Sequence, residues 1–291
     1  MVLEYSYCAL KARKRDWDRF ICTLFAPQDL REDLFAILAF NAEIARTREV
    51  VSEPMLGAIR LQWWRDALAK IYGQDDIGSN VDLKGHEVLN ALGTVIRDYD
   101  LPKRYFDTLI DVRAQDMTDN LPENVPALRA YAHGSSVMLN ELILEILCWQ
   151  RSGEADLFRE CIQEAGLAWA LTGLVRATGS LSRCGSIMIP QSVLDECGVE
   201  KDDVLARRIT PEISQAIREV CHFSWGHIDK ARKSAPRKIK RCRSLLLPVT
   251  LAESFLRRIE KAGFNPFDET IEKGRTGRQV KLAVKALRGG F

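Results

Sequence analysis

The sequence has no run of apolar residues long enough to cross a bilayer. A membrane-spanning helix needs about 20 apolar residues, whereas the longest apolar segment, Leu139–Trp149, is short and contains Glu141 and Glu145. The N-terminal stretch has no signal-peptide core, and Glu4 and Asp16 interrupt any transit-peptide pattern. We therefore expect a cytoplasmic protein that can lie peripherally on the inner membrane of a bacterium. A trimmed eukaryotic chain would instead belong in the mitochondrial matrix.

The sequence also lacks a marked charge excess and a metal-binding cysteine pattern. Lys and Arg number 42 against 40 Asp and Glu, so the net charge of +2 implies no particular partner. None of the eight cysteines forms a C-x-x-C pair, the spacing typical of zinc and thioredoxin-like sites. Most cysteines lie in apolar helical contexts. We therefore expect reduced thiols in the core of a protein from a reducing compartment.

Strand-like alternation of apolar and polar residues is absent beyond a few positions, and no internal repeat is visible. Apolar residues recur instead at the helical period of about 3.6 residues. The chain has 291 residues, of which 46% are hydrophobic, enough for a large core. These patterns predict an all-α helical bundle.

The periodicity predicts a helix for each long segment. The expected helices cover residues 6–25, two helices within 34–72, then 86–99, 102–117, 128–149, 154–178, 191–197, 211–234, 244–261 and 270–288. Asp29 is expected to cap the helix that follows it, and Ser52 with Pro54 to start the second helix of 34–72. Residues 73–85, 118–126 and the Gly/Ser-rich stretch 179–190 are expected to be loops.

The stretch 34–72 organises these expectations. Its second helix carries an apolar stripe that we expect to face the core, namely Leu56, Ile59, Trp63, Ala67 and Ile71. Adjacent side chains on a helix point about 100° apart, so at most one of Trp63 and Trp64 can face a ligand. Core packing is the preferred role for both.

Three stretches of the sequence carry a family resemblance. They are FAILAFNAEIARTREVV, the RLQWWRDAL-type helix after it, and the later Ile187-Met188-Ile189-Pro190. All three resemble the squalene/phytoene synthase family. The resemblance covers nearly the whole chain. It implies the all-α isoprenoid synthase fold as a single domain over residues 1–291. Active members of the family condense two prenyl diphosphates, with Mg²⁺ held between Asp side chains of two motifs and the substrate diphosphate.

This sequence departs from the family at the Asp positions. The first motif falls on Ala45 and Glu49, and the second falls on Gly173, Ala177 and Leu181, so Glu49 is the only acidic residue among them. The family's reaction begins with ionisation of a diphosphate, whose developing charge Mg²⁺ must neutralise. Because a hard cation needs several oxygen ligands, we assign no catalytic residue, no metal ligand and no cofactor.

The departures match one branch of the family. Three short motifs carry this match. They are Phe40-Asn41-x-Glu43, Val51-Ser52-Glu53 and Arg176-Ala177-Thr178. These motifs resemble the branch that includes an assembly factor for mitochondrial respiratory complex I. The resemblance implies a non-catalytic assembly or scaffold factor, with a subunit of a respiratory complex as its client. A prenyl or other lipid-like ligand is expected in the remaining pocket.

The pocket candidates follow from the family's helix faces. One wall is expected to carry Asn41, Ala45, Arg48 and Glu49, and the other Gly173, Arg176 and Ala177, with Tyr131 nearby. Two guanidinium groups, those of Arg48 and Arg176, can hold a diphosphate or another anion without metal. The alternative is that these two arginines pair with Glu43 or Glu49 in a closed core.

Two other functions are compatible with the sequence. An active transferase would need Mg²⁺ ligands outside the matched positions, for example Glu43, Asp111, Asp116 or Asp119. A ligand-binding protein without an assembly role would need only the pocket.

A strongly basic segment, residues 230–243, is the main charge feature. Its cations are Lys230, Arg232, Lys233, Arg237, Lys238, Lys240, Arg241 and Arg243. We consider a solvated loop and a patch for an anionic membrane surface. A nucleic-acid partner is not expected, because no binding motif or interleaved aromatic residue accompanies the charge.

Overall fold

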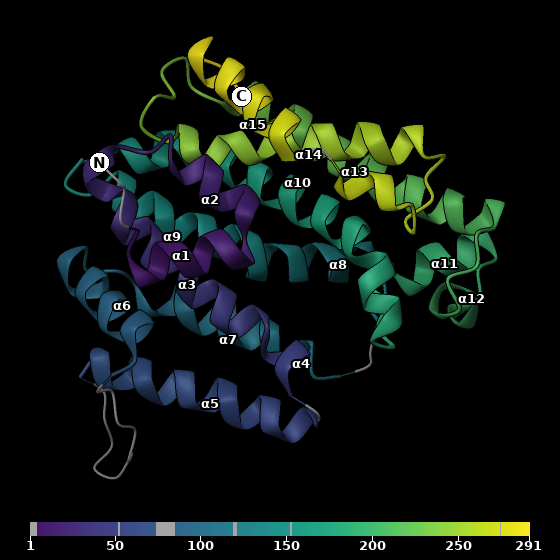
Figure 1. Cartoon of the computed structure of the whole chain (residues 1–291), viewed down its shortest axis with the longest axis horizontal. Coiled ribbons are helices and arrows are strands. Elements are labelled where there is room, and N and C mark those ends of the chain that lie inside the picture. Colours follow the sequence, from purple (N-terminus) through teal and green to yellow (C-terminus); the bar gives the residue numbers. More distant parts are fainter. Residues whose placement is uncertain (1–4, 52, 74–84, 119–120, 152, 274) are drawn as a thin grey trace. The chain divides into compact units, whose positions relative to one another are not determined.

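The computed structural model describes residues 5–51, 53–73, 85–118, 121–151, 153–273 and 275–291, and within them every regular element is a helix (Figure 1). The expected all-α class is therefore confirmed. The roles expected of Ser52 and Asp119, and most of the loop 73–85, lie outside these residues. The chain divides into two compact units, Met1–Thr118 with Met138–Leu157, and Asp119–Val137 with Phe158–Phe291.

The first unit is built around one buried helix. Its elements are α1 (Tyr7–Arg15), α2 (Trp17–Thr23), η1 (Gln28–Leu30), α3 (Arg31–Ala45), α4 (Thr47–Val50), α5 (Pro54–Ile71), α6 (Glu87–Asp98), α7 (Lys103–Gln115) and α9 (Met138–Leu147). Helix α3 packs against α1, α2, α6, α7 and α9. Its residues from Leu34 to Asn41 are all buried, as their continuous apolar run requires.

The N-terminal segment forms two helices where one was expected. Asp16 ends α1 in a non-helical conformation, and its carboxylate accepts a hydrogen bond from the Arg19 backbone N–H at 3.1 Å, so it caps α2. The cap expected from Asp29 was wrong. Helix α3 starts at Arg31 after a 3₁₀ turn, with no side-chain cap.

Of the apolar stripe predicted for helix α5, Ala67 is buried as expected, but the other four residues are not. Trp64 is 1% exposed and packs edge-on against Phe40, with ring centroids 5.1 Å apart, whereas Leu56 and Ile59 face solvent. Gly57 is buried because α5 passes close to Met117, and a Cβ at this position would collide with the Met117 sulfur. Pro54 starts the helix as predicted.

The second unit contains the remaining helices. They are α8 (Val125–Ala132), η2 (His133–Val137), α10 (Glu154–Arg183, within this unit from Phe158), α11 (Gln191–Cys197), α12 (Lys201–Leu205), α13 (Pro211–Ser234), α14 (Arg243–Lys261), η3 (Glu269–Glu272) and α15 (Arg275–Leu287). A buried hydrogen bond of 2.8 Å joins the Thr172 and Ser224 hydroxyls, and so ties α10 to α13. Helices α13 and α14 pack together, and α15 packs on α14.

Three expected boundaries in this part of the chain were wrong. Residues 179–183 continue α10, because buried Gly179 packs against the Pro266–Phe267 backbone and the Ser182 hydroxyl bonds to the Thr178 carbonyl. A π-helical turn, η2, interrupts the helix expected over 128–149. The last expected helix, 270–288, is instead the 3₁₀ turn η3 followed by α15.

Candidate functional site

The second predicted wall lies on α10. Gly173, Arg176 and Ala177 are three and four positions apart, so they share one side of the helix, and all three are partly exposed. A Cβ added at Gly173 would meet no atom within 4 Å, so there is open space beside this residue. Leu181, one turn further on, is also partly exposed.

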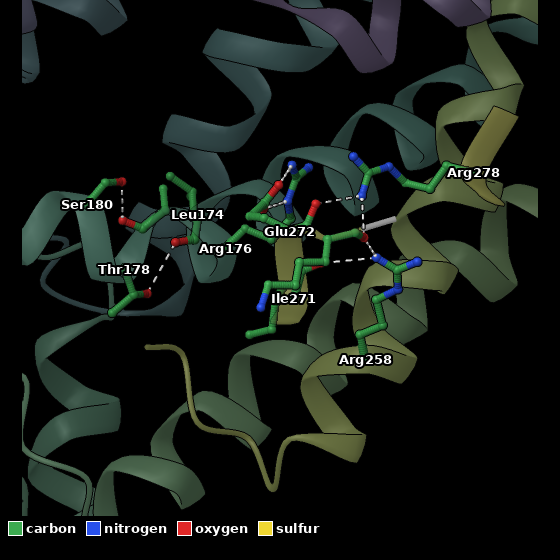
Figure 2. Close-up of polar contacts among 10 residues, drawn as sticks. Leu174, Arg176, Thr178, Ser180, Arg258, Ile271, Glu272 and Arg278 are labelled. Carbon is green, nitrogen blue, oxygen red and sulfur yellow. Dashed lines mark hydrogen bonds and ion pairs between the residues drawn. The ribbon is translucent and has the colours of Figure 1, made fainter. Parts of the chain in front are cut away.

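Arg176 forms a two-pronged ion pair with Glu272 of η3 (Figure 2). Its Nε donates to Oε1 at 2.7 Å and its Nη2 donates to Oε2 at 3.0 Å, the parallel arrangement that orients a guanidinium most strongly. The guanidinium carbon also lies 3.5 Å from the ring centroid of buried Phe255. A cation held over an aromatic face gains further electrostatic attraction.

Two more arginines hold the backbone around Glu272. Arg258 donates to the carbonyls of Ile271, at 3.3 Å, and Lys273. Arg278, which is 3% exposed, donates to the carbonyl of Glu272 at 3.2 Å and to that of Lys273 at 3.3 Å. Figure 2 shows these arginines converging on the η3 segment beside α10.

The charges around Glu272 change its titration. Partial burial acts to raise the pKa of its carboxyl group, but the hydrogen bonds and charge of Arg176, with Arg278 and Arg258, outweigh burial and lower that pKa. Glu272 is therefore ionised throughout the neutral range, and it supplies an internal anion for the arginine that the sequence proposed as an anion ligand.

The first predicted wall lies in the first unit, on α3 and α4. Asn41 is buried, Ala45 and Arg48 are half-buried, and Glu49 is exposed. Glu49 pairs with Arg46 one turn away, at 3.3 Å. The two walls thus belong to different units, and their common pocket stays a prediction.

Glu43 forms the most enclosed ion pairs of this wall. Its carboxylate is 11% exposed and bridges Lys11 of α1 and Arg60 of α5, with an Arg60 distance of 2.5 Å. Because Glu43 sits on α3, these contacts tie three helices together. The closed-core alternative foresaw Glu43 and Glu49 in ion pairs, but the partners observed for them are Lys11, Arg60 and Arg46.

Tyr131 is buried at the end of α8, where the π turn begins. The Ser135 hydroxyl donates to the Tyr131 carbonyl at 2.8 Å, which satisfies an acceptor at the helix irregularity. Such π turns often accompany functional sites. The place of Tyr131 near a pocket nevertheless stays a prediction.

The side chains at the family's metal positions do not fit Mg²⁺. Ala45, Gly173, Ala177 and Leu181 offer no side-chain oxygen, and Glu49 is engaged by Arg46. Among the described residues, no group of three or more His, Cys, Asp or Glu side chains is placed to hold a metal ion. We therefore derive no reaction step through a metal.

The alternative Mg²⁺ ligands, where described, also lie in ion pairs. Asp111 accepts from Arg65 at 2.8 Å and Asp116 pairs with Arg113 at 3.3 Å. Each carboxylate therefore already balances a cation within the first unit.

The basic segment is described in full and runs from the end of α13 into α14. Lys230, Lys233, Arg237, Lys238 and Lys240 are exposed, whereas Arg232 reaches Glu253 of α14 at 2.6 Å. Arg241 and Arg243 are half-buried. In the described residues no helix has the length and apolarity of a membrane span.

The sequence model of squalene/phytoene synthase matches residues 12–284. The chain belongs to the squalene/phytoene synthase family. The match crosses both units, and solved structures share the fold. A dehydrosqualene synthase covers 97% of this chain and 94% of its own, with a TM-score of 0.79 at 14% identity. A squalene synthase from Alicyclobacillus acidocaldarius covers 89% and 94%, with a TM-score of 0.72 at 21% identity. The isoprenoid synthase fold expected from the sequence is therefore confirmed.

Relatives of this family member include complex I assembly factors and phytoene synthases. A human protein named NADH dehydrogenase (ubiquinone) complex I, assembly factor 6, is 28% identical over 97% of this chain and 81% of its own length. A Drosophila melanogaster homologue of that factor is 26% identical over 89% and 76%. Phytoene synthase 1 of Solanum lycopersicum is 21% identical over 86% of this chain and 60% of its own. The expected resemblance to the assembly-factor branch is thus confirmed.

The Arg176–Glu272 arrangement was missed at the level of sequence, although Arg176 was not. The segment around Glu272 showed only a helical pattern, and no motif marked Phe255, Arg258 or Arg278. Nothing in the linear sequence relates these residues to α10, so no signal for the cluster was available.

Proposed function

We propose that this protein is an assembly factor for respiratory complex I and not a prenyltransferase. The observation that carries the proposal is the similarity to complex I assembly factor 6 along 97% of the chain. We base the assembly role on those relatives and not on the fold, because a shared fold alone does not determine function.

The side chains at the metal positions support the non-catalytic part of the proposal. Release of diphosphate needs a cation cluster that neutralises charge on the leaving group. Of the matched positions only Glu49 is acidic, and it pairs with Arg46. On α10, Arg176 is held by Glu272, so the one charged residue of that wall already has an anionic partner.

The same proposal includes a ligand and a location. We propose that the protein binds a prenyl or other lipid-like molecule. The exposed cations of the basic segment then bind the protein to an anionic membrane surface. Five of the eight basic residues are exposed, which suits them to lipid headgroups.

Gene deletion tests the assembly role. We expect cells without this chain to contain less assembled complex I on native gels, and their membranes to oxidise NADH more slowly. Both defects should be rescued by the wild-type gene. They should also be rescued by Glu49→Ala, which removes the last acidic residue at the metal positions. Normal complex I in the deletion strain would overturn the assembly role.

A direct assay tests the enzymatic alternative. Purified protein is given farnesyl or geranylgeranyl diphosphate with and without Mg²⁺, and pyrophosphate is measured. We expect no release from a preparation whose helical circular dichroism shows it to be folded. Metal-dependent release with a condensed hydrocarbon product would establish a transferase and contradict the non-catalytic proposal.

A further inference from the structure

Helix α15 has an apolar stripe that faces solvent. Val280 is 59% exposed, Val284 is 40% exposed and Leu287 is 87% exposed. Their spacings of four and three residues place them along one side of the helix. The opposite side is already used, because Leu282 and Ala286 are buried and α15 packs on α14. The outer stripe is therefore a second apolar face that the fold does not need.

The charged side chains in the segment that carries this stripe have one sign. Residues 273–291 contain six Lys or Arg and no Asp or Glu. At about 100° per residue, Lys281, Lys285 and Arg288 follow one flank of the helix, between the outer stripe and the buried face. A helix with an apolar face and a basic flank is suited to the interface of an anionic membrane.

The acidic side chain that acts on this flank is already paired with arginines of the neighbouring helices. Glu253 of α14 is the acidic group that acts on Lys281. Its two carboxylate oxygens pair with Arg232, at 2.6 Å, and with Arg257, at 2.8 Å. Partial burial lowers the pKa of Lys281, Glu253 opposes this, and Arg257, Lys285 and Arg232 lower it further. Figure 1 shows α15 next to α14, against which it packs.

We propose that α15 is a membrane-docking helix that places Val280, Val284 and Leu287 into the surface of an anionic lipid bilayer. Lys281, Lys285 and Arg288 then lie at the level of the lipid headgroups. The inference rests on the membrane location included in the proposed function, and it names the element that contacts lipid. Docking of α15 also explains why the stripe is apolar, because attraction between cations and anionic lipid would not need exposed apolar side chains.

Charge decides between a bilayer and a second copy of the chain. Two copies joined through this stripe would bring two sets of cations together, without an acidic residue in 273–291 to offset them. An anionic bilayer instead offers both hydrocarbon and negative charge. A second exposed apolar patch, at Met55 and Ile59 of α5, has Glu49 and Glu53 near it in the chain, both exposed, so it is a matched control and not a candidate.

The test is flotation of the full chain with vesicles. Wild type is expected to bind phosphatidylcholine vesicles that contain phosphatidylglycerol and not to bind vesicles of pure phosphatidylcholine. Its binding should weaken as the salt concentration rises. The stripe variant, Val280→Ser/Val284→Ser/Leu287→Ser, should bind about tenfold or more weakly because it loses apolar area. The flank variant, Lys285→Glu/Arg288→Glu, should lose at least as much.

Two control variants accompany these. Met55→Ser/Ile59→Ser removes equally exposed apolar side chains from α5 and should bind like wild type. Lys238→Glu/Lys240→Glu reverses charge in the basic segment alone. Thermal melting by circular dichroism checks that each variant is folded, and all substituted side chains are at least partly exposed.

Each outcome decides the question. If the stripe variant binds like wild type while the Lys238→Glu/Lys240→Glu variant fails, the membrane location stands and the role of α15 is overturned. If wild type binds no vesicle, the membrane location and the role of α15 are both overturned. Equal binding to neutral vesicles, or an equal loss in the α5 control, also overturns the proposal. Light scattering that shows a dimer dissolved by the stripe substitutions would identify a second copy as the occupant, against a bilayer.

Discussion

Arg176 and Glu272 are 96 positions apart in the chain, yet they meet through two parallel hydrogen bonds. Arg176 is 16% exposed and Glu272 is 55% exposed, so solvent screens the pair in part. The interaction joins the last turns of α10 to the segment before α15. It places an internal carboxylate on the guanidinium that the sequence alone suggested for a ligand.

Removing this carboxylate should cost little stability but change anion binding. We expect Glu272→Gln to lower the free energy of unfolding by about 1 kcal/mol or less, as for other partly exposed ion pairs. Pyrophosphate should then bind more tightly, because Arg176 has lost its competitor. Urea unfolding and calorimetry measure the two effects. Glu269→Gln, on an exposed neighbour in η3, is the matched control. Unchanged pyrophosphate binding would count against Arg176 as an anion ligand.

The same pair makes stability depend on pH in a defined direction. The pKa of Glu272 is lower in the folded protein than its ordinary value of 4.5. The ionised form therefore contributes stability above the unfolded value, and this contribution is lost as pH falls through the folded pKa. The difference in unfolding free energy between wild type and Glu272→Gln should be constant near neutrality and shrink in acid. A difference that grows in acid would contradict the assigned sign.

Two carboxylates on α10 should create metal affinity where none is expected now. The double variant Gly173→Asp/Ala177→Asp places them one turn apart on one helix face. A Cβ at Gly173 would meet no neighbouring atom within 4 Å. We expect calorimetry to detect Mg²⁺ or Mn²⁺ binding by this variant and not by Gly173→Asn/Ala177→Asn, which has similar shape and no charge. Equal behaviour of the two variants would refute the placement of the second motif on α10.

The two adjacent tryptophans of α5 should differ sharply in their contribution to stability. Trp64 is 1% exposed and packs on Phe40, so Trp64→Ala should cost about 3–5 kcal/mol of unfolding free energy. Trp63 is half-buried and contacts the His86 ring, with centroids 5.2 Å apart, so Trp63→Ala should cost about 1 kcal/mol. Urea titration gives both values. A reversed order would mean that α5 is rotated from the orientation described above.

Cysteine reactivity should separate one thiol from the rest. No disulfide joins any of the eight cysteines, and Cys184 is the exposed one. Burial raises the pKa of Cys8 to about 11 and those of Cys161 and Cys221 to about 12, so few of these thiols are ionised at neutral pH. A thiol reagent should label native protein first at Cys184, and Cys184→Ser should abolish this fast phase. Labelling of the buried thiols should require denaturant. A fast phase that survives Cys184→Ser would contradict this order.

Much of the fold was predictable because local chemistry marks helix ends. Pro54 and Pro211 begin α5 and α13, and Gly198 follows α11 in the left-handed conformation at φ 67°. The helical period then determined the all-α class. Loop signals were less reliable. Gly179 and Ser182 look like loop residues, but tertiary packing and a local hydrogen bond keep both in α10.

The helical class, the family and the loss of most acidic residues at the metal positions could be read without a structure, because they depend on residue identity and local spacing. Tertiary structure decided what those residues contact. Which face of α5 is buried depends on the neighbours of Trp64, and neighbours are not encoded in a helical period. The pairing of Arg176 with Glu272 requires η3 to lie beside α10, a relationship set by packing across 96 positions and by no local preference.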